Sequence, residues 1–90
     1  MRSRNLTFAS TAWDEYMEWQ KRDKKIANRI NLLIKDIQRS PFEGLGKPEP
    51  LKENLSGYWS RQITEKHRIV YQVSKDNIKI IQVENHYNDK

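Results

Sequence analysis

Five polar side chains in the second half of the chain carry groups that could act on a phosphodiester. Glu49 stands between two prolines, Lys52 follows three residues later, and Arg68 lies in a strand-like run. The pair His86-Tyr87 comes near the end of the chain. One carboxylate, two cations and one imidazole are the groups that a metal-free phosphodiester cleavage requires. The sequence therefore offers the parts for acid–base chemistry on a polyanion.

The backbone around Glu49 is restricted by its neighbours. Pro48 fixes the bond before it, and Pro50 pushes Glu49 towards extended dihedral angles. The carboxylate could thus be presented at low conformational cost, as a general base requires. The alternative is an ordinary surface glutamate beside a turn. Lys52 also has two interpretations, a contact to phosphate or a lysine that only adds solubility.

Two arginines lie in predicted strands. The alternation around Arg68 points it away from the core, where its planar guanidinium could stabilise charge on a phosphorane. The alternative is a cross-strand ion pair, with Glu49 as a candidate partner. The spacing of Arg61 does not assign it to either face of the sheet, so a surface position and a substrate-binding position both stay open.

The two histidines have different expectations. His86 ends the last predicted strand and could donate a proton near neutral pH. Its neighbour Tyr87 could stack on a base or orient a phosphate. The alternative is that both belong to a frayed chain end. His67 has the opposite parity to Arg68 and is expected to pack or to hydrogen-bond near the start of its strand.

The first half of the chain predicts a short strand and a first helix. Residues 5–8 alternate polar and apolar, as a strand does. Ser10 or Thr11 could cap a helix that runs to about Lys21, with acidic residues in its first turn. We expect this helix to bury a broad aromatic face. The acidic residues are Asp14 and Glu15, and the face comprises Ala12, Trp13, Tyr16, Met17 and Trp19.

A second helix is predicted from about Asp23, which can cap it, to Ser40-Pro41, where the proline ends it. Its apolar residues form one stripe at helical spacing. Its basic residues cover the remaining surface, either as a solvated face or as contacts to backbone phosphates. The stripe is Ile26, Ala27, Ile30, Leu33, Ile34 and Ile37.

The second half predicts a constrained loop over 42–55, with at most a brief strand, and then three strands over 58–64, 67–74 and 77–84. Short connectors at Glu65-Lys66 and Lys75-Asp76 make these strands antiparallel. The expected fold is α+β in β-α-α-β-β-β order. Two helices pack on one face of a twisted antiparallel sheet. Ile69, Tyr71 and Val73 suit the buried face, and Arg68, Val70 and Gln72 the open one.

Composition limits the possibilities. Ninety residues fit a single domain, 1–90, and the 17 Lys and Arg against 12 Asp and Glu give a net charge of +5. This excess favours a polyanion partner, nucleic acid first, although mildly basic small proteins are common.

Several classes of site and location are disfavoured. The absence of cysteine excludes disulfides and thiolate metal sites, and two histidines are few for a zinc site. With no long apolar run and no apolar signal core, we expect no membrane segment and a cytoplasmic protein.

The motifs together resemble one family. The run PFEGLGKPEPLKENLSGYWSRQITEKHRIVYQV, the upstream WDEYMEWQKRDKKIANRINLLIKDIQRS and the terminal HY are similar to the YoeB (Txe) toxins of the RelE superfamily of toxin–antitoxin systems. The similarity spans Leu6 to Tyr87. It implies a RelE-like fold and a ribosome-dependent endoribonuclease that cuts mRNA in the decoding site without a cofactor or metal.

The resemblance also implies residue roles. The base of the KPEPLK motif falls on Glu49 and the cation after it on Lys52. The arginine of the HR-VY strand falls on Arg68, the terminal acid on His86 and its supporting tyrosine on Tyr87. Many members carry two arginines after W-S. Here the second position is Gln62, so a substrate contact there is either missing or supplied by Arg61. The tail Asn88-Asp89-Lys90 extends beyond the usual end and could shift the acid.

The partners implied are a cognate YefM/Phd-like antitoxin, the 70S ribosome with its mRNA, and a second copy of the chain. Two other functions remain open on the sequence. One is a non-catalytic relative such as a ParE-like gyrase inhibitor, which would not need Glu49 and His86. The other is a basic RNA-binding regulator without chemistry.

Overall fold

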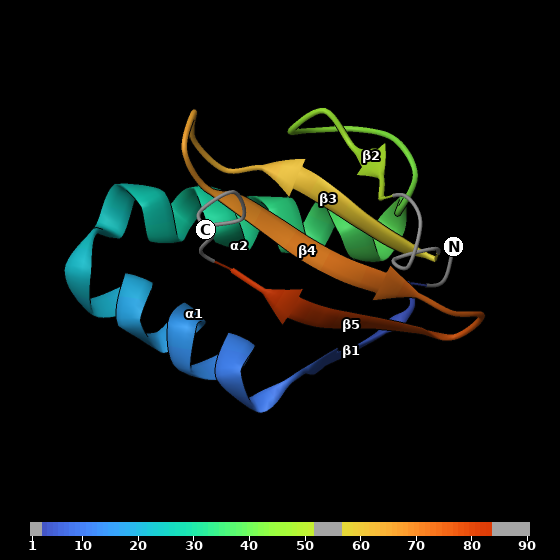
Figure 1. Cartoon of the computed structure of the whole chain (residues 1–90), viewed down its shortest axis with the longest axis horizontal. Helices are drawn as coiled ribbons and strands as arrows, with labels where there is room; N and C mark the ends of the chain where they lie inside the picture. The colour runs from blue at the N-terminus through green and yellow to red at the C-terminus, as the bar shows by residue number, and fades with distance from the viewer. Residues whose placement is uncertain (1–2, 52–56, 84–90) are drawn as a thin grey trace.

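The computed structural model describes residues 3–51 and 57–83, which form two helices and a five-stranded sheet (Figure 1). The predicted β-α-α-β-β-β order is confirmed, with one additional two-residue strand after the helices. None of the helices in these residues is long and apolar enough to cross a membrane. The elements are β1 (Asn5–Phe8), α1 (Ser10–Arg22), α2 (Lys24–Arg39), β2 (Glu49–Pro50), β3 (Tyr58–Gln62), β4 (Arg68–Val73) and β5 (Asn77–Gln82).

The start of α1 differs from the prediction. Its N-cap is Ala9, which makes no side-chain cap, and its first turn holds no acidic residue. The pairing of β1 continues as far as Ala9, whose N–H bonds to the carbonyl of Ile80, 2.9 Å away. The Ala9 carbonyl then accepts from the N–H of Trp13. The helix therefore begins at Ser10, directly after the strand pairing ends at Ala9. Neither Ser10 nor Thr11 is the cap.

The aromatic face of α1 is also less buried than predicted. Only Ala12 and Trp19 are fully buried, whereas Trp13 and Met17 are 46% and 43% exposed. Phe8, Trp13 and Tyr16 instead gather their rings at the corner between β1 and α1. Ala12 and Trp19 lie seven positions apart and so on one side of α1, where Tyr16 also packs partly buried against the core.

The second helix follows its sequence pattern closely. The Asp23 side chain accepts a hydrogen bond from the N–H of Ile26 at 3.2 Å, and so caps α2 as predicted. The helix ends at Arg39, immediately before Ser40-Pro41. Five residues of the predicted stripe are buried and Ile26 packs partly buried against the core. The stripe anchors the helix on the sheet through the hydrophobic effect.

The sheet has the order β1-β5-β4-β3-β2 and is mixed. β3, β4 and β5 form the predicted antiparallel meander, and β2 adds antiparallel to β3. β1, however, pairs parallel with β5, so the expectation of a wholly antiparallel sheet is wrong for this edge. The strand β1 is separated from β5 by two helices, and such a long connection allows parallel pairing.

The two faces of the sheet have different surroundings. Figure 1 shows α2 crossing behind β3 and β4, and the core between them contains the fully buried Ile69 and Tyr71. Val73 packs partly buried against the same core, so the predicted parity of β4 is confirmed. The opposite face, which we call the open face, carries Arg68. It is not uniformly exposed, since Val70 on this face is buried.

Candidate active site

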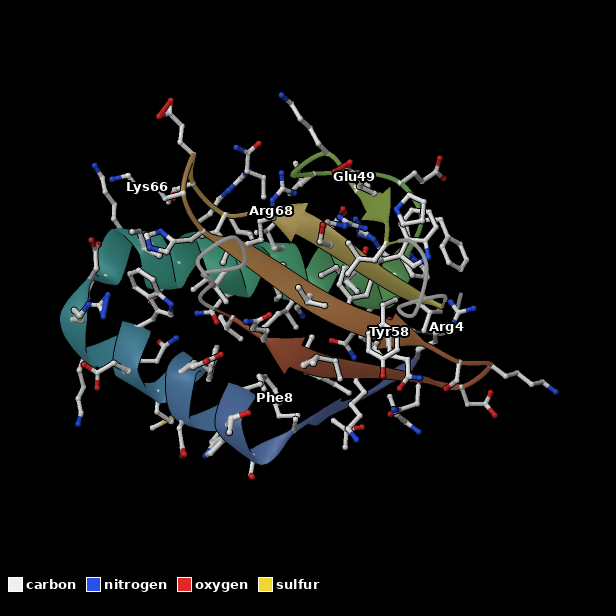
Figure 2. The ribbon with its side chains drawn as sticks, in the orientation of Figure 1. Arg4, Phe8, Glu49, Tyr58, Lys66 and Arg68 are labelled. Atoms are coloured by element: carbon white, nitrogen blue, oxygen red, sulfur yellow. The ribbon has the colours of Figure 1, made fainter. Side chains whose placement is uncertain are left out.

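Strand pairing brings Glu49 and Arg68 onto the same face although 19 residues separate them. Glu49 of β2 pairs with Ser60 of β3, and Ser60 pairs with Val70 of β4. Paired residues share a face, and so do residues two apart in one strand. Glu49, Ser60 and Arg68 therefore all belong to the open face. Figure 2 shows Glu49 and Arg68 at the side of the sheet where β2 and β3 lie.

The contact between Glu49 and Arg68 is loose and accessible. Glu49 Oε1 lies 3.8 Å from Arg68 Nη1, and the two side chains are 62% and 31% exposed. Arg68 Nη1 also donates to Ser60 Oγ at 3.4 Å. The cross-strand ion pair with Glu49, considered as an alternative to a phosphate contact, is thus present. At this distance and exposure the pair is a surface ion pair, which contributes little to stability.

The other three residues of the predicted site, Lys52, His86 and Tyr87, lie outside the residues that the structure describes. The structure accordingly brings together two members of the predicted set, Glu49 and Arg68. Within residues 3–51 and 57–83, no three metal-ligating side chains gather in one place.

The structure contradicts both positions that were predicted for Arg61. It is neither at the surface nor available to a substrate, since it is 0% exposed and faces the core beside Ile69. Its guanidinium makes five hydrogen bonds inside the protein. Nε donates to Tyr71 Oη at 3.1 Å, Nη1 to Asp36 Oδ2 at 2.6 Å and to the Leu45 carbonyl at 3.0 Å, and Nη2 to the carbonyls of Ser40 at 2.6 Å and Glu43 at 3.1 Å.

This buried network shifts two pKa values. Burial opposes ionisation of Asp36, but the hydrogen bonds from Arg61 and from the Leu45 N–H, with the charges of Arg61 and Arg39, hold the pKa of that carboxyl below its ordinary value. Burial raises the pKa of the Tyr71 hydroxyl, against the opposing effect of Arg61. Asp36 is therefore the anion that balances the buried arginine.

His67 takes the structural position expected of it. Its Nδ1 lies 3.0 Å from Thr64 Oγ1, and its ring meets Trp19 edge-on with centroids 5.0 Å apart. These contacts lie at the turn before β4, so His67 packs there instead of facing the open side.

Ser60 was missed by sequence reasoning. It is 1% exposed and pairs with Glu49 on one side and Val70 on the other, and its hydroxyl accepts a hydrogen bond from Arg68. Gln62 pairs directly with Arg68 and so lies on the same face. Ser60 could have been found by extending the strand alternation from Arg68 back through the turn into the preceding strand. That inference requires the length of the turn to be known to within one residue.

Known proteins resemble this chain over most of its length. The family model of the YoeB-like toxin of bacterial type II toxin–antitoxin systems matches residues 8–87. Toxin YoeB of Escherichia coli strain K12 is 56% identical over 82 residues, which cover 91% of this chain and 98% of that protein.

Solved structures show the same likeness. The YoeB/ParE toxin from Agrobacterium tumefaciens has a TM-score of 0.89 and 47% identity, covering 92% of this chain and 99% of its own. The YoeB dimer from Staphylococcus aureus has a TM-score of 0.87 and 46% identity, covering 96% and 100%. A toxin chain of the same origin occurs in a heterotetrameric YoeB–YefM toxin–antitoxin complex, with a TM-score of 0.85, 46% identity and the same coverage. On the family match and these identities, the chain belongs to the YoeB-like toxins of bacterial type II toxin–antitoxin systems.

Proposed function

We propose that this toxin is a ribosome-dependent endoribonuclease that cuts mRNA in the decoding site and thereby stops translation. The observation that carries the proposal is the approach of the Glu49 carboxylate to the Arg68 guanidinium on the open face, at 3.8 Å with both side chains accessible. A base beside a planar cation is the arrangement that attack on a phosphodiester needs. Family membership supports the same reading.

The proposed reaction uses the ribose of the RNA as nucleophile. Glu49 takes the proton from a 2′-OH, and the 2′-oxygen attacks the adjacent phosphorus. The bond from phosphorus to the 5′-oxygen breaks, and a proton from His86 goes to that leaving oxygen. The products are a 2′,3′-cyclic phosphate and a 5′-OH. No metal takes part in this scheme, and DNA resists because it lacks the 2′-OH.

The remaining roles concern charge and orientation. Arg68, with the help of Lys52, stabilises the negative charge that builds on the phosphorus oxygens. Tyr87 orients His86 or stacks on a base. The roles of Lys52, His86 and Tyr87 are supported by their positions in the family motifs, since all three lie outside the described residues.

We also propose the partners. The S. aureus relative forms a complex with YefM and, in another structure, a dimer. By this likeness the chain is held inactive by a YefM-like antitoxin and pairs with a second copy of itself in the bacterial cytoplasm. The ribosome with its mRNA is the partner in the toxic state.

The test is primer extension on mRNA incubated with purified protein, with and without ribosomes. We expect discrete cuts inside codons only when ribosomes are present. Glu49→Gln and Arg68→Gln should each lower the cleavage rate about 100-fold or more, as loss of a general base or of an electrostatic stabiliser does. Glu65→Gln, in an exposed turn, is the control for a charge change.

Three outcomes would contradict the proposal. Full activity of either site variant rejects the role of that residue. Poisoning of gyrase without ribosomes identifies the ParE-like alternative. Ribosome or RNA binding without any cleavage identifies a regulator.

A further inference from the structure

We infer that Arg61 is a positioning residue, which holds the loop before Glu49 and thereby sets where the Glu49 carboxylate stands. With Asp36 and Tyr71 it forms what we call the Arg61 clamp. The inference rests on the proposed function, because it assigns the clamp a role in cleavage through Glu49. It concerns a group that never touches the RNA.

Every donor of the Arg61 guanidinium is used inside the protein. A guanidinium has five N–H groups in a rigid fork, and the structure gives Arg61 five hydrogen bonds. Three of them go to backbone carbonyls of the 40–47 loop, which connects α2 to the segment before Glu49. A loop that turns its carbonyls inward around one cation takes its shape from that cation. The three carbonyls are those of Ser40, Glu43 and Leu45.

The other two members of the clamp hold the same loop. Tyr71 Oη accepts from Arg61 Nε and donates to the Pro41 carbonyl at 2.7 Å. Asp36 Oδ2 accepts from Arg61 Nη1 and from the Leu45 N–H at 3.0 Å. Side chains of α2, β3 and β4 thus hold the loop between residues 40 and 45 in this conformation. They bind the carbonyls of Ser40, Pro41, Glu43 and Leu45 and the N–H of Leu45.

The loop also leaves no space between itself and the clamp. Gly44 has φ +123°, and a Cβ added there would collide with the Asp36 carboxylate. Gly46 has φ +78°, and a Cβ there would lie 2.9 Å from the Gln62 carbonyl and 3.2 Å from Arg61 Cβ. Both positions require glycine for conformation and for space. The fit shows that loop and clamp are built against each other.

The restraint is passed to Glu49 over a short distance along the chain. The Gly46 carbonyl accepts from the Gln62 N–H at 2.7 Å, and Lys47 has φ +52°. Glu49 comes two residues after Lys47, in a strand of only two residues. Two paired residues at a sheet edge add little stability of their own. The position of β2 thus depends on the loop that leads into it.

A role in stability alone does not account for the clamp. Buried ion pairs lose much of their attraction to desolvation, and apolar side chains of the same volume often replace them without loss. What five directional bonds supply is one conformation of the loop, and a base needs to be held close to its working geometry.

The decisive variant is Tyr71→Phe, which removes one hydroxyl from the clamp and leaves Arg61, Asp36 and Glu49 in place. We expect the single-turnover cleavage rate at saturating ribosomes to fall at least about tenfold, since misplacement of a catalytic group lowers the rate at this scale. The ribosome concentration for half-maximal rate should change less than about twofold. Amide exchange at Gln62 and Leu51, whose N–H groups bond to the Gly46 and Tyr58 carbonyls, should accelerate.

The matched control is a core variant of equal stability loss. Ile78 is fully buried in β5 and makes none of these contacts. Whichever of Ile78→Val and Ile78→Ala matches the melting temperature of Tyr71→Phe should retain the wild-type rate. Arg61→Lys is a second variant, which keeps the charge beside Asp36 but lacks the fork, and we expect it to behave like Tyr71→Phe.

Glu49→Gln separates this inference from the proposed function. If the wild-type protein gives no ribosome-dependent cuts, the proposed function fails. If Glu49→Gln cleaves normally, the role of Glu49 as the base fails, and the clamp has no base to position. If Glu49→Gln is inactive while Tyr71→Phe cleaves at the rate of its Ile78 control, the proposed function stands and the clamp is only structural. A rise in the half-maximal ribosome concentration with an unchanged saturating rate would also overturn the inference, since it would place the clamp in binding.

Discussion

Arg61 and Arg68 are the same type of residue, seven positions apart, and their different surroundings are the basis of the different roles that we propose for them. Arg61 is 0% exposed and has all five N–H groups bound within the protein. Arg68 is 31% exposed on its side chain and lies 3.8 Å from Glu49. The Arg61 guanidinium has no N–H group left to donate to a phosphate, whereas Arg68 is partly exposed beside Glu49, as its proposed role at the phosphate requires. At the residue scale, surroundings decide function more than residue type does.

Ser60 is expected to support Arg68. Its buried hydroxyl accepts from Arg68 Nη1 at 3.4 Å, which is a long and therefore weak hydrogen bond. Ser60→Ala should lower the cleavage rate about three- to tenfold, because a modest bond to a charged group is lost. Single-turnover primer extension measures this. Ser10→Ala, at an exposed position that forms no side-chain cap, is the control and should have the wild-type rate.

The pH dependence of stability should reveal the contribution of the ionised Asp36 carboxylate. Its pKa in the folded protein lies below the ordinary 3.8, so its contribution to stability is complete above pH 3.8 and is lost as the pH falls through the lowered pKa. Asp36→Asn should reduce the free energy of unfolding at pH 7 by about 2 kcal/mol, as loss of a charged hydrogen bond does.

Urea unfolding of both proteins from pH 7 to pH 2 measures the difference. The gap in the free energy of unfolding between wild type and Asp36→Asn should be constant above pH 3.8 and should narrow as the pH falls below it. A gap that is unchanged at pH 2 would contradict the assignment of the charge to Asp36.

At the scale of elements, α2 could be predicted because its signals are local. The stripe of apolar residues, the cap at Asp23 and the stop at Ser40-Pro41 all lie within one segment, and the structure confirms each. The residues of the candidate active site were harder to predict than this helix. Glu49 and Arg68 could be chosen from prolines and strand parity, but Arg61 could not be placed, because its face depends on the connection between β3 and β4.

The length of the connection between β3 and β4 explains why Arg61 was not placed on the correct face. The sequence predicts a connector of two residues, Glu65-Lys66, whereas β3 ends at Gln62 and β4 begins at Arg68. The observed register pairs Arg61 with Ile69 and Ser60 with Val70. A shift of one residue exchanges the two faces of a strand, so a small error in the turn would place Arg61 on the open face and hide Ser60. Local patterns do not contain this information.

The cap of α2 allows a test at this scale. Asp23→Ala removes the acceptor of the Ile26 N–H and should lower the free energy of unfolding by about 1 kcal/mol. Thermal unfolding followed by circular dichroism should show a fall of about 4–8 °C in Tm for a chain of this size. Cleavage well below Tm should be unaffected, since the cap lies on the helix side of the sheet. Asp14→Ala, exposed within α1, should leave Tm within about 2 °C of wild type, as surface substitutions usually do.

On the scale of the whole molecule, the sheet separates two surfaces. The helices and the core lie on one side, and Glu49 and Arg68 lie on the other (Figures 1 and 2). The net charge of the chain is +5, and its exposed basic residues include some on the helices and some on the open face. RNA cleaved by the proposed pair must lie along the open face, so only the cations there should contact its phosphates. The proposal therefore favours the solvated alternative for the basic residues of α2, which stays a prediction.

Lys79 and Lys25 distinguish these surfaces. Lys79 of β5 is exposed and pairs with Gln72, so it belongs to the open face, whereas Lys25 is exposed on α2. Binding to programmed ribosomes can be measured by co-sedimentation over a range of salt concentrations. The logarithm of the binding constant should fall linearly with the logarithm of the salt concentration, because phosphate contacts release counterions. Lys79→Gln should reduce the magnitude of that slope by about one. Lys25→Gln, with the same loss of charge, should leave the slope unchanged. If Lys25→Gln lowers the slope and Lys79→Gln does not, the RNA lies against the helices, where the Glu49 carboxylate could not reach its 2′-OH.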